Sequence, residues 1–340
     1  MESNTFIEDT LSRPIRDLRI SVTDRCNFRC TYCMPKEVFN SKYEFLRRDD
    51  LLSFEEITRI SKVFAKLGVK KIRLTGGEPL LRKNIPVLID QLAKIEGIED
   101  ISLTTNGVLL TEEMAQQLKD AGLQRITVSL DALDDETFKA ISDVSFNVDK
   151  VLDAIEIASS VGLSPVKVNM VVKKGVNEHA ILPMIKHFHG SDKILRFIEF
   201  MDVGSTNQWQ MDDVFSAKEI VNVIDQELPI EPADANYHGE VAKRWRYKDG
   251  GGEVGVISSV TQPFCQSCTR ARLSAEGKLY TCLFATQGKD LRHLIRQGAK
   301  DEFIADIVSA VWKKRADQYS ELRSTETVIL PKVEMSYIGG

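Results

Sequence analysis

The stretch CNFRCTYC, residues 26–33, places three cysteines in one short segment that directly follows an apolar, β-type run. Thiols at C-x3-C-x2-C spacing can converge on one metal centre from a single loop. A structural zinc ion needs four protein ligands, and the nearest histidine in the sequence is His179. Cysteine-ligated iron–sulfur clusters tolerate unusual capping ligands. The pattern therefore favours a cluster with one open position over zinc.

Composition and cysteine usage narrow the class of protein. The 340 residues carry a formal net charge of −5, so we expect no nucleic-acid partner. The N-terminal MESNTFIEDT, residues 1–10, is acidic and lacks a signal pattern, and we expect no membrane partner. We expect a cytoplasmic protein with reduced thiols. The six cysteines form two triplets, which favours metal binding: Cys26, Cys30 and Cys33, then Cys265, Cys268 and Cys282.

Short β-type runs alternate with amphipathic helical stretches over the first part of the chain. This alternation predicts an α/β fold with a parallel sheet. Six such units fall short of an eight-fold barrel, so the sequence predicts an incomplete (βα)6 barrel over residues 13–205. The expected strands are residues 18–22, 70–75, 100–105, 125–130, 165–172 and 194–200.

Alternate residues of these strands share one face of the sheet. One face is apolar and suits packing under helices, whereas the other is polar and basic. A barrel that fills its own interior carries branched apolar side chains there, so a polar interior predicts an enclosed ligand. The polar face is expected to carry Arg19, Ser21, Thr23, Lys71, Arg73, Thr75, Ser102, Thr104, Arg125, Thr127, Ser129, Lys167, Asn169, Glu199 and Met201.

The alternation stops after about residue 205, and residues 206–340 form a C-terminal extension that contains the second cysteine triplet. We expect a helix near 217–227, short strands near 241–247 and 253–258, and a helix near 300–318. The glycine-rich KDGGGEVG, residues 248–255, predicts a hairpin turn between the two strands.

The first cysteine motif resembles the signature of the radical S-adenosylmethionine (SAM) superfamily, and TGGEP, residues 75–79, resembles its GGE motif. The resemblance implies that three cysteines hold three irons of a [4Fe-4S] cluster. SAM would then chelate the fourth iron and be cleaved to a 5′-deoxyadenosyl radical. The SAM-binding positions implied by this resemblance are Tyr32, Gly76, Gly77, Glu78, Ser129 and Met201.

Residues 13–35, 264–284 and the final Gly-Gly resemble the GTP 3′,8-cyclase family of molybdenum-cofactor biosynthesis. The resemblance implies a second [4Fe-4S] cluster whose free iron binds the guanine of GTP. It also implies cyclisation of GTP to 3′,8-cyclo-7,8-dihydro-GTP, with Gly339 and Gly340 supporting catalysis. The implied GTP-binding residues are Arg19, Lys71, Arg73, Thr104, Lys167, Arg270 and Arg272.

Two alternatives stay open on the sequence: a radical SAM enzyme that modifies a peptide, and a zinc-binding interaction module. The cyclase interpretation implies an unidentified electron donor, and a cyclic pyranopterin synthase that takes the product. A homodimer is possible. Residues 142–147, SDVSFN, depart from many relatives, which carry an arginine in this loop.

Overall fold

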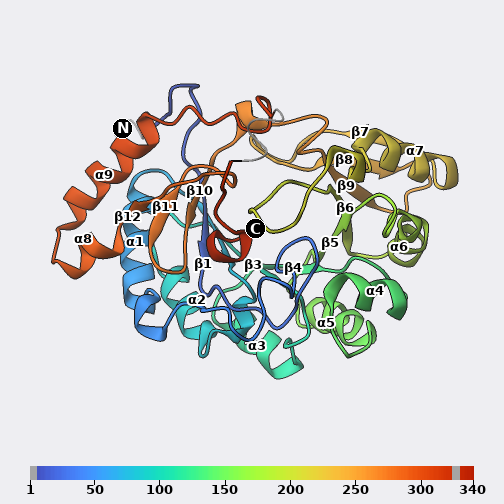
Figure 1. The fold of residues 1–340 in the computed structure, drawn as a ribbon, viewed down its shortest axis with the longest axis horizontal. Coiled ribbons are helices and arrows are strands. Elements are labelled where there is room, and N and C mark those ends of the chain that lie inside the picture. Colours follow the sequence, from blue (N-terminus) through green and yellow to red (C-terminus); the bar gives the residue numbers. More distant parts are fainter. Residues whose placement is uncertain (1–5, 324–329) are drawn as a thin grey trace.

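The computed structural model describes residues 6–323 and 330–340. Residues 1–5 of the acidic N-terminal stretch therefore lie outside the described residues. Six parallel strands form the centre of the molecule, and the helices between them cover its outer side (Figure 1). The strands are β1 (Asp17–Ser21), β2 (Lys71–Thr75), β3 (Asp100–Thr105), β4 (Arg125–Ser129), β5 (Lys167–Val172) and β6 (Ile194–Glu199).

Two of the connecting helices, α1 and α3, begin at residues that favour helix starts. Ser53 and Glu56 form a capping box at α1, and the Thr111 side chain caps α3. No helix within the described ranges is long and apolar enough to cross a membrane. The helices are α1 (Phe54–Lys66), α2 (Ile85–Ala93), α3 (Glu112–Asp120), α4 (Asp135–Ser142), α5 (Asp149–Ser160) and α6 (Ile181–Phe188).

The C-terminal extension adds strands to both edges of this sheet. β10 pairs in parallel with β1, and β9 pairs in parallel with β6, which gives the order β12-β11-β10-β1-β2-β3-β4-β5-β6-β9-β8-β7. The elements are α7 (Ala217–Glu227), β7 (Ile230–Ala233), β8 (Lys243–Tyr247), β9 (Glu253–Ile257), β10 (Arg270–Leu273), β11 (Lys278–Tyr280), β12 (Lys289–Asp290), α8 (Arg292–Arg296), α9 (Asp301–Lys313) and α11 (Met335–Ile338).

The predicted α/β class and the six parallel strands are confirmed. The predicted helix at 217–227 and the β8–β9 hairpin are also present. The expected helix near 300–318 is shorter, because α9 ends at Lys313. Strands β7 and β10 to β12 were not predicted.

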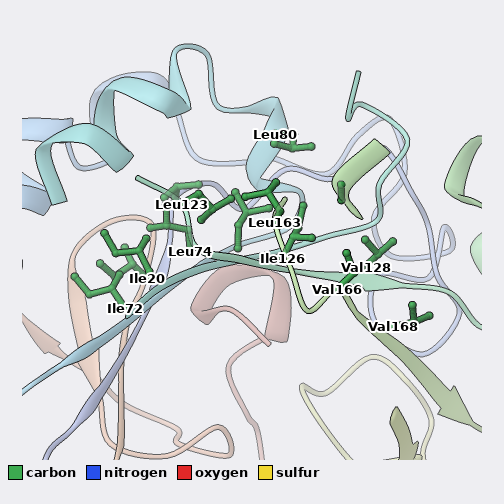
Figure 2. Packing of buried hydrophobic residues seen from close by; sticks show 14 of the residues in the cluster. Ile20, Ile72, Leu74, Leu80, Leu123, Ile126, Val128, Leu163, Val166 and Val168 are labelled. Atoms are coloured by element: carbon green, nitrogen blue, oxygen red, sulfur yellow. The ribbon is translucent and has the colours of Figure 1, made fainter. Parts of the chain in front are cut away.

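The hydrophobic core lies between the sheet and the helices. Figure 2 shows apolar side chains of neighbouring strands packed together on the helix side. The register explains this, because Ile20 stands beside Leu74, and Leu74 stands beside Leu103. All three side chains are fully buried. Large apolar burial of this kind is the main stabilising contribution to the fold.

The opposite face of the sheet carries the predicted polar side chains on five strands, but the prediction for β6 is wrong. Asn169 on the polar face of β5 stands beside Arg196, not beside Glu199. Glu199 instead pairs in register with the core residue Val172 and accepts hydrogen bonds from the amides of Ala217 (2.7 Å), Val260 and Thr261. Its carboxylate therefore fastens the extension to the sheet.

Helix α2 offers a direct test of the core. Ile89 is fully buried in α2, whereas Val87 on the same helix is 50% exposed. We expect Ile89→Ala to lower the free energy of unfolding by about 2–5 kcal/mol, because it leaves a cavity. Val87→Ala should change it by less than about 0.5 kcal/mol. Urea unfolding followed by circular dichroism would measure both, and equal shifts would contradict this packing.

Candidate active site

A cavity on the polar face of the sheet extends from the start of β1 and β10 to the C-terminal ends of the strands and is lined by both cysteine triplets. Residues from β1 to β6, from the extension and from the end of the chain line it. Of the residues predicted from sequence, the lining includes Arg19, Cys26, Cys30, Tyr32, Cys33, Arg73, Gly76, Gly77, Glu78, Thr104, Ser129, Met201, Cys265, Cys268, Arg270, Arg272, Cys282 and Gly340. Among the described residues, Lys71, Lys167 and Gly339 stand outside this lining.

The first cysteine loop follows β1 and is fixed by its own backbone and by the end of α4. The amides of Arg29 and Thr31 donate to the carbonyls of Ser142 (3.0 Å) and Ile141 (2.9 Å). The Arg29 guanidinium donates back to the carbonyl of Cys26 at 2.8 Å. The end of α4 and the start of the 142–147 loop thus hold the backbone of the first cysteine loop through hydrogen bonds.

Burial dominates the electrostatics of the first triplet. It raises the pKa of the Cys26 thiol to about 12 and also raises the pKa values of Cys30 and Cys33. Iron coordination requires thiolates, and a metal cluster deprotonates its cysteine ligands. Three desolvated thiols in one loop therefore suit a metal cluster and are poorly suited to act as free nucleophiles.

The Gly76–Gly77 pair lets the loop after β2 pass directly against the first cysteine loop. A Cβ on Gly76 would lie 2.4 Å from the carbonyl oxygen of Thr23, and one on Gly77 would lie 2.2 Å from that of Arg25. The amide of Gly77 donates to Thr23 at 2.8 Å. Gly76 also has φ +146°, which disfavours other residues. The glycines are thus required by contact between the two loops at the cavity wall.

Glu78 fixes the loop after β2 through hydrogen bonds within the protein. Its carboxylate accepts from the amides of Leu80 (2.9 Å) and Asn106 (2.8 Å), and from the hydroxyl of Thr105 (2.8 Å). The residue is 1% exposed, and burial raises its pKa to about 7. Glu78 therefore joins the loops after β2 and β3 at the cavity wall.

Tyr32 is held in place by Asp131, which follows β4. The phenol donates to the Asp131 carboxylate at 2.8 Å, and the other carboxylate oxygen accepts from the amide of Val171 at 2.8 Å. Asp131 is 5% exposed. The sequence did not single out Asp131, although its position after a strand end is typical of site residues in such sheets.

A buried group of three charged residues frames the second cysteine triplet. Arg13 donates to the carboxylate of Asp9 (2.6 Å) and to the carbonyl of Cys265 (2.7 Å). Arg315 donates to the same carboxylate (3.0 Å) and to the carbonyl of Cys268 (2.8 Å). Arg13 and Arg315 thus hold the backbone of this cysteine loop, and Asp9 balances part of their charge.

Arginine changes the electrostatics of the second triplet. Burial raises the pKa of the Cys268 thiol, but Arg270 and Arg315 outweigh burial and lower it to about 6. Two guanidinium nitrogens of Arg270 lie 3.2 and 3.1 Å from the Cys268 sulfur. A thiolate is therefore stabilised here by cations, in contrast to the first triplet.

A row of arginines crosses the sheet between the two triplets. The register places Arg19 beside Arg272 on one side and beside Arg73 on the other. Neighbouring strands are about 4.8 Å apart, and like charges directly opposite each other are destabilising. Burial, followed by the neighbouring arginines, lowers the pKa of Arg19 well below its usual value. The row calls for a polyanionic ligand.

Several buried polar atoms of the cavity wall have no hydrogen-bond partner within the described part of the chain. The donors among them on β1 to β3 are Nε of Arg19, Nε of Arg73 and the hydroxyl of Thr104, and the carboxylate oxygen Oδ1 of Asp17 is also unpaired. Buried polar groups in folded proteins are almost always paired, so these atoms indicate a ligand that completes their hydrogen bonds. Two donors of this kind on arginine suit phosphate oxygens.

Sequence reasoning missed Arg196, because it chose the wrong face of β6. Arg196 lines the cavity, is 6% exposed and donates to the side chain of Asn169 at 2.9 Å. Of the two predicted lysines, Lys71 pairs with Asp100 at 3.2 Å. Lys167 lies on the polar face, and burial, followed by the charge of Arg196, lowers its pKa to about 7.

The end of the chain forms part of the cavity wall. Arg272 donates to the carbonyl of Gly339, and Gly340 lines the cavity. Gly339 has φ +78°, and a Cβ there would come within 2.2 Å of a Thr75 methyl group. Glycine is thus needed for this close approach to the end of β2.

The geometry does not support the zinc-binding alternative. Among residues 6–323 and 330–340, no group of three or more His, Cys, Asp or Glu side chains is arranged to hold a metal ion. A zinc site would need four ligands around one ion. Neither cysteine triplet is arranged around a single ion in this structure, and both triplets line one shared cavity.

Two family models and many curated proteins match this chain. The Radical SAM superfamily model matches residues 20–188, and the Molybdenum Cofactor Synthesis C model matches residues 193–321. A GTP 3′,8-cyclase of Staphylococcus aureus strain Mu3 is 52% identical over 338 residues, which is 98% of this chain and 99% of that protein. The GTP 3′,8-cyclase of Staphylococcus epidermidis strain ATCC 35984 matches to the same extent.

Solved structures agree on the fold. Streptococcus suis SuiB, bound to its precursor peptide SuiA, aligns with a TM-score of 0.63 over 93% of this chain and 70% of that chain. The identity is 13%, so this likeness shows a shared fold alone. The relatives at 52% identity span nearly the whole chain, and they decide between the cyclase and the peptide-modifying alternative. The chain belongs to the GTP 3′,8-cyclase family of radical SAM enzymes.

Proposed function

We propose that the cavity binds SAM at the first cysteine triplet and GTP at the second, with the arginine row between them. The observation that supports this is one cavity lined by both triplets and by buried arginine nitrogens without partners. Family membership makes the chain a radical SAM enzyme of molybdenum-cofactor biosynthesis, with SAM and two [4Fe-4S] clusters as cofactors.

The first triplet would hold one cluster, and the loops around it would hold SAM. With a reduced cluster and SAM bound, the site would supply a 5′-deoxyadenosyl radical that takes the 3′ hydrogen of GTP. Closure of the C3′–C8 bond would leave an unpaired electron on the guanine, so one further electron and one proton are required to give 3′,8-cyclo-7,8-dihydro-GTP. The protein orients SAM through the Gly76–Gly77 cradle and through Tyr32, whose ring is fixed by Asp131. Glu78 keeps the cradle rigid, and Ser129 and Met201 complete the same wall.

The second triplet would hold the other cluster and receive the guanine of GTP. Arg19, Arg73 and Arg272 would bind the triphosphate, since their row provides fixed donors and uncompensated positive charge. Further residues would assist in binding GTP. They are Arg270, Thr104, Lys71, Lys167 and Arg196, the last of which was not predicted from the sequence. Gly339 and Gly340 would assist the reaction from the end of the chain.

The reaction also implies partners and a compartment. An unidentified one-electron donor must reduce the first cluster, and a cyclic pyranopterin synthase would take the product. We place the protein in the cytoplasm, where thiols stay reduced and can hold iron. Residues 13–205 would form the radical SAM partial barrel, and residues 206–340 would carry the second cluster and close the barrel around GTP.

Product analysis tests the proposal. After anaerobic incubation with SAM, GTP and dithionite, chromatography with mass detection should find 5′-deoxyadenosine and the cyclised nucleotide. The reconstituted protein should contain about eight irons per chain. Replacing Cys26, Cys30 and Cys33 together by alanine should halve the iron and abolish SAM cleavage.

Replacing Cys265, Cys268 and Cys282 together by alanine is the matched variant. It should also halve the iron but leave SAM binding, while GTP affinity and cyclisation are lost. Formation of 5′-deoxyadenosine by the first variant, or unchanged GTP affinity in the second, would contradict the assignment of the two triplets.

A second prediction concerns the arginine row. Arg73→Ala should weaken GTP binding by about 1.5–3 kcal/mol, the range of charge-assisted hydrogen bonds, or roughly 10- to 150-fold in Kd. Arg125→Ala is the control, because Arg125 is two positions away in the same row but pairs with Asp100 at 3.2 Å. Isothermal titration would measure both ligands. Guanosine lacks phosphates, so its affinity should change little in the Arg73→Ala variant. Equal losses for guanosine and GTP would point to a damaged fold.

A third prediction concerns pH. Burial and neighbouring arginines lower the pKa of Lys167 to about 7, so the free protein loses this charge as pH rises above 7. A bound triphosphate favours the protonated lysine, so GTP affinity should fall between pH 7 and 9, by at most about tenfold per pH unit. Lys167→Met should flatten this slope. The titration of GTP itself affects both proteins equally, so it cancels when the parent protein is compared with Lys167→Met. If GTP affinity fell with pH at the same rate in both proteins, Lys167 would be excluded from the site.

A further inference from the structure

A buried carboxylate three residues after the end of β6 forms ion pairs with two basic side chains from the C-terminal part of the chain. Asp202 is 2% exposed and accepts from Lys332 Nζ at 2.8 Å and from Arg323 Nε at 3.0 Å. The hydroxyl of Tyr319 donates to it as well. Removing a charge from such a buried group leaves its partners uncompensated.

Backbone and side-chain hydrogen bonds close around this ion pair. The amide of Ser205 donates to Glu334 at 3.0 Å, and the amide of Lys332 donates to the hydroxyl of Ser205 at 2.8 Å. Gly204 has φ +66°, and a Cβ there would lie 2.2 Å from a carboxylate oxygen of Glu334. We call residues 202–206 together with 332–334 the clasp.

The clasp fixes the start of the segment that ends in the cavity. Glu334 is the N-cap residue of α11, and Ile338 at the end of that helix is fully buried. Arg272 then holds the carbonyl of Gly339, and Gly340 lines the cavity. The position of Gly340 therefore depends on where Glu334 is held.

The other side of the clasp belongs to the cavity wall. Met201 and Val203, on either side of Asp202, both line the cavity. The side-chain amide of Asn207 donates to the carbonyl of Met201 at 2.9 Å, which ties the loop together. The same short loop thus contacts the proposed SAM side and anchors the tail.

We propose that Asp202 is a positioning residue that anchors the tail through Lys332 and so places Gly339 and Gly340 in the cavity. This inference rests on the proposed function where it concerns turnover. The anchoring itself is a property of the folded chain and can be measured without turnover.

Asp202→Asn and Gly204→Ala test the clasp from two sides. The first weakens the ion pair, and the second places a methyl group against Glu334. Hydrogen exchange followed by mass spectrometry should show at least tenfold faster exchange of amides 335–340 in both variants, with α1 unchanged. Iron content and SAM affinity should stay within twofold of the parent protein. The yield of cyclised product per 5′-deoxyadenosine should fall at least fivefold, because the tail is displaced.

Asp212→Asn is the matched control, because Asp212 is an exposed carboxylate in the same loop region. It should leave exchange and the product ratio unchanged. Unchanged exchange in both clasp variants would overturn the anchoring. Faster exchange with an unchanged product ratio would show that the clasp does not position the tail for turnover. If the parent protein made no cyclised product, the proposed function would fail, whereas the exchange result would still decide the anchoring.

Discussion

The repulsion among Arg272, Arg19 and Arg73 is the constraint on which the site depends. Strand pairing places these three side chains beside one another on a buried face. Hydrophobic packing on the opposite face holds the strands in that register, so the three arginines leave the backbone at neighbouring positions. Two of their nitrogens are left without partners in the described chain. Under the proposed function, the triphosphate of GTP would complete these hydrogen bonds and offset the repulsion among the arginines.

The two cysteine triplets have similar spacing but different electrostatic surroundings. Burial dominates at Cys26, Cys30 and Cys33, and their pKa values are raised. At Cys268, Arg270 and Arg315 overcome burial. A cluster in the second loop would therefore be surrounded by more positive charge than a cluster in the first loop. This difference suits a division in which the first loop receives SAM and the second loop receives a substrate that brings several negative charges of its own.

The sequence predicted the strands and most of the inner face, because a period of two is a local signal. It failed on β6, where Arg196 and Glu199 are both polar and stand on opposite faces, so polarity alone could not select the right one. It also could not predict that β9 and β10 extend the two edges of the sheet, since register between distant segments is set by tertiary packing. The frame around the second triplet was missed for the same reason: Asp9 and Arg315 are 306 positions apart.

The tail shows how distant contacts can place a segment that has little structure of its own. Helix α11 has four residues, and helices this short are unstable in isolation. Ordering the backbone costs about 1–2 kcal/mol per residue, so the segment needs stabilising contacts outside itself. Burial of Ile338, the hydrogen bond from Arg272 and the ion pair between Lys332 and Asp202 provide them. The ion pair stands one residue from Met201, which lines the cavity, so the same loop supports both the cavity wall and the tail.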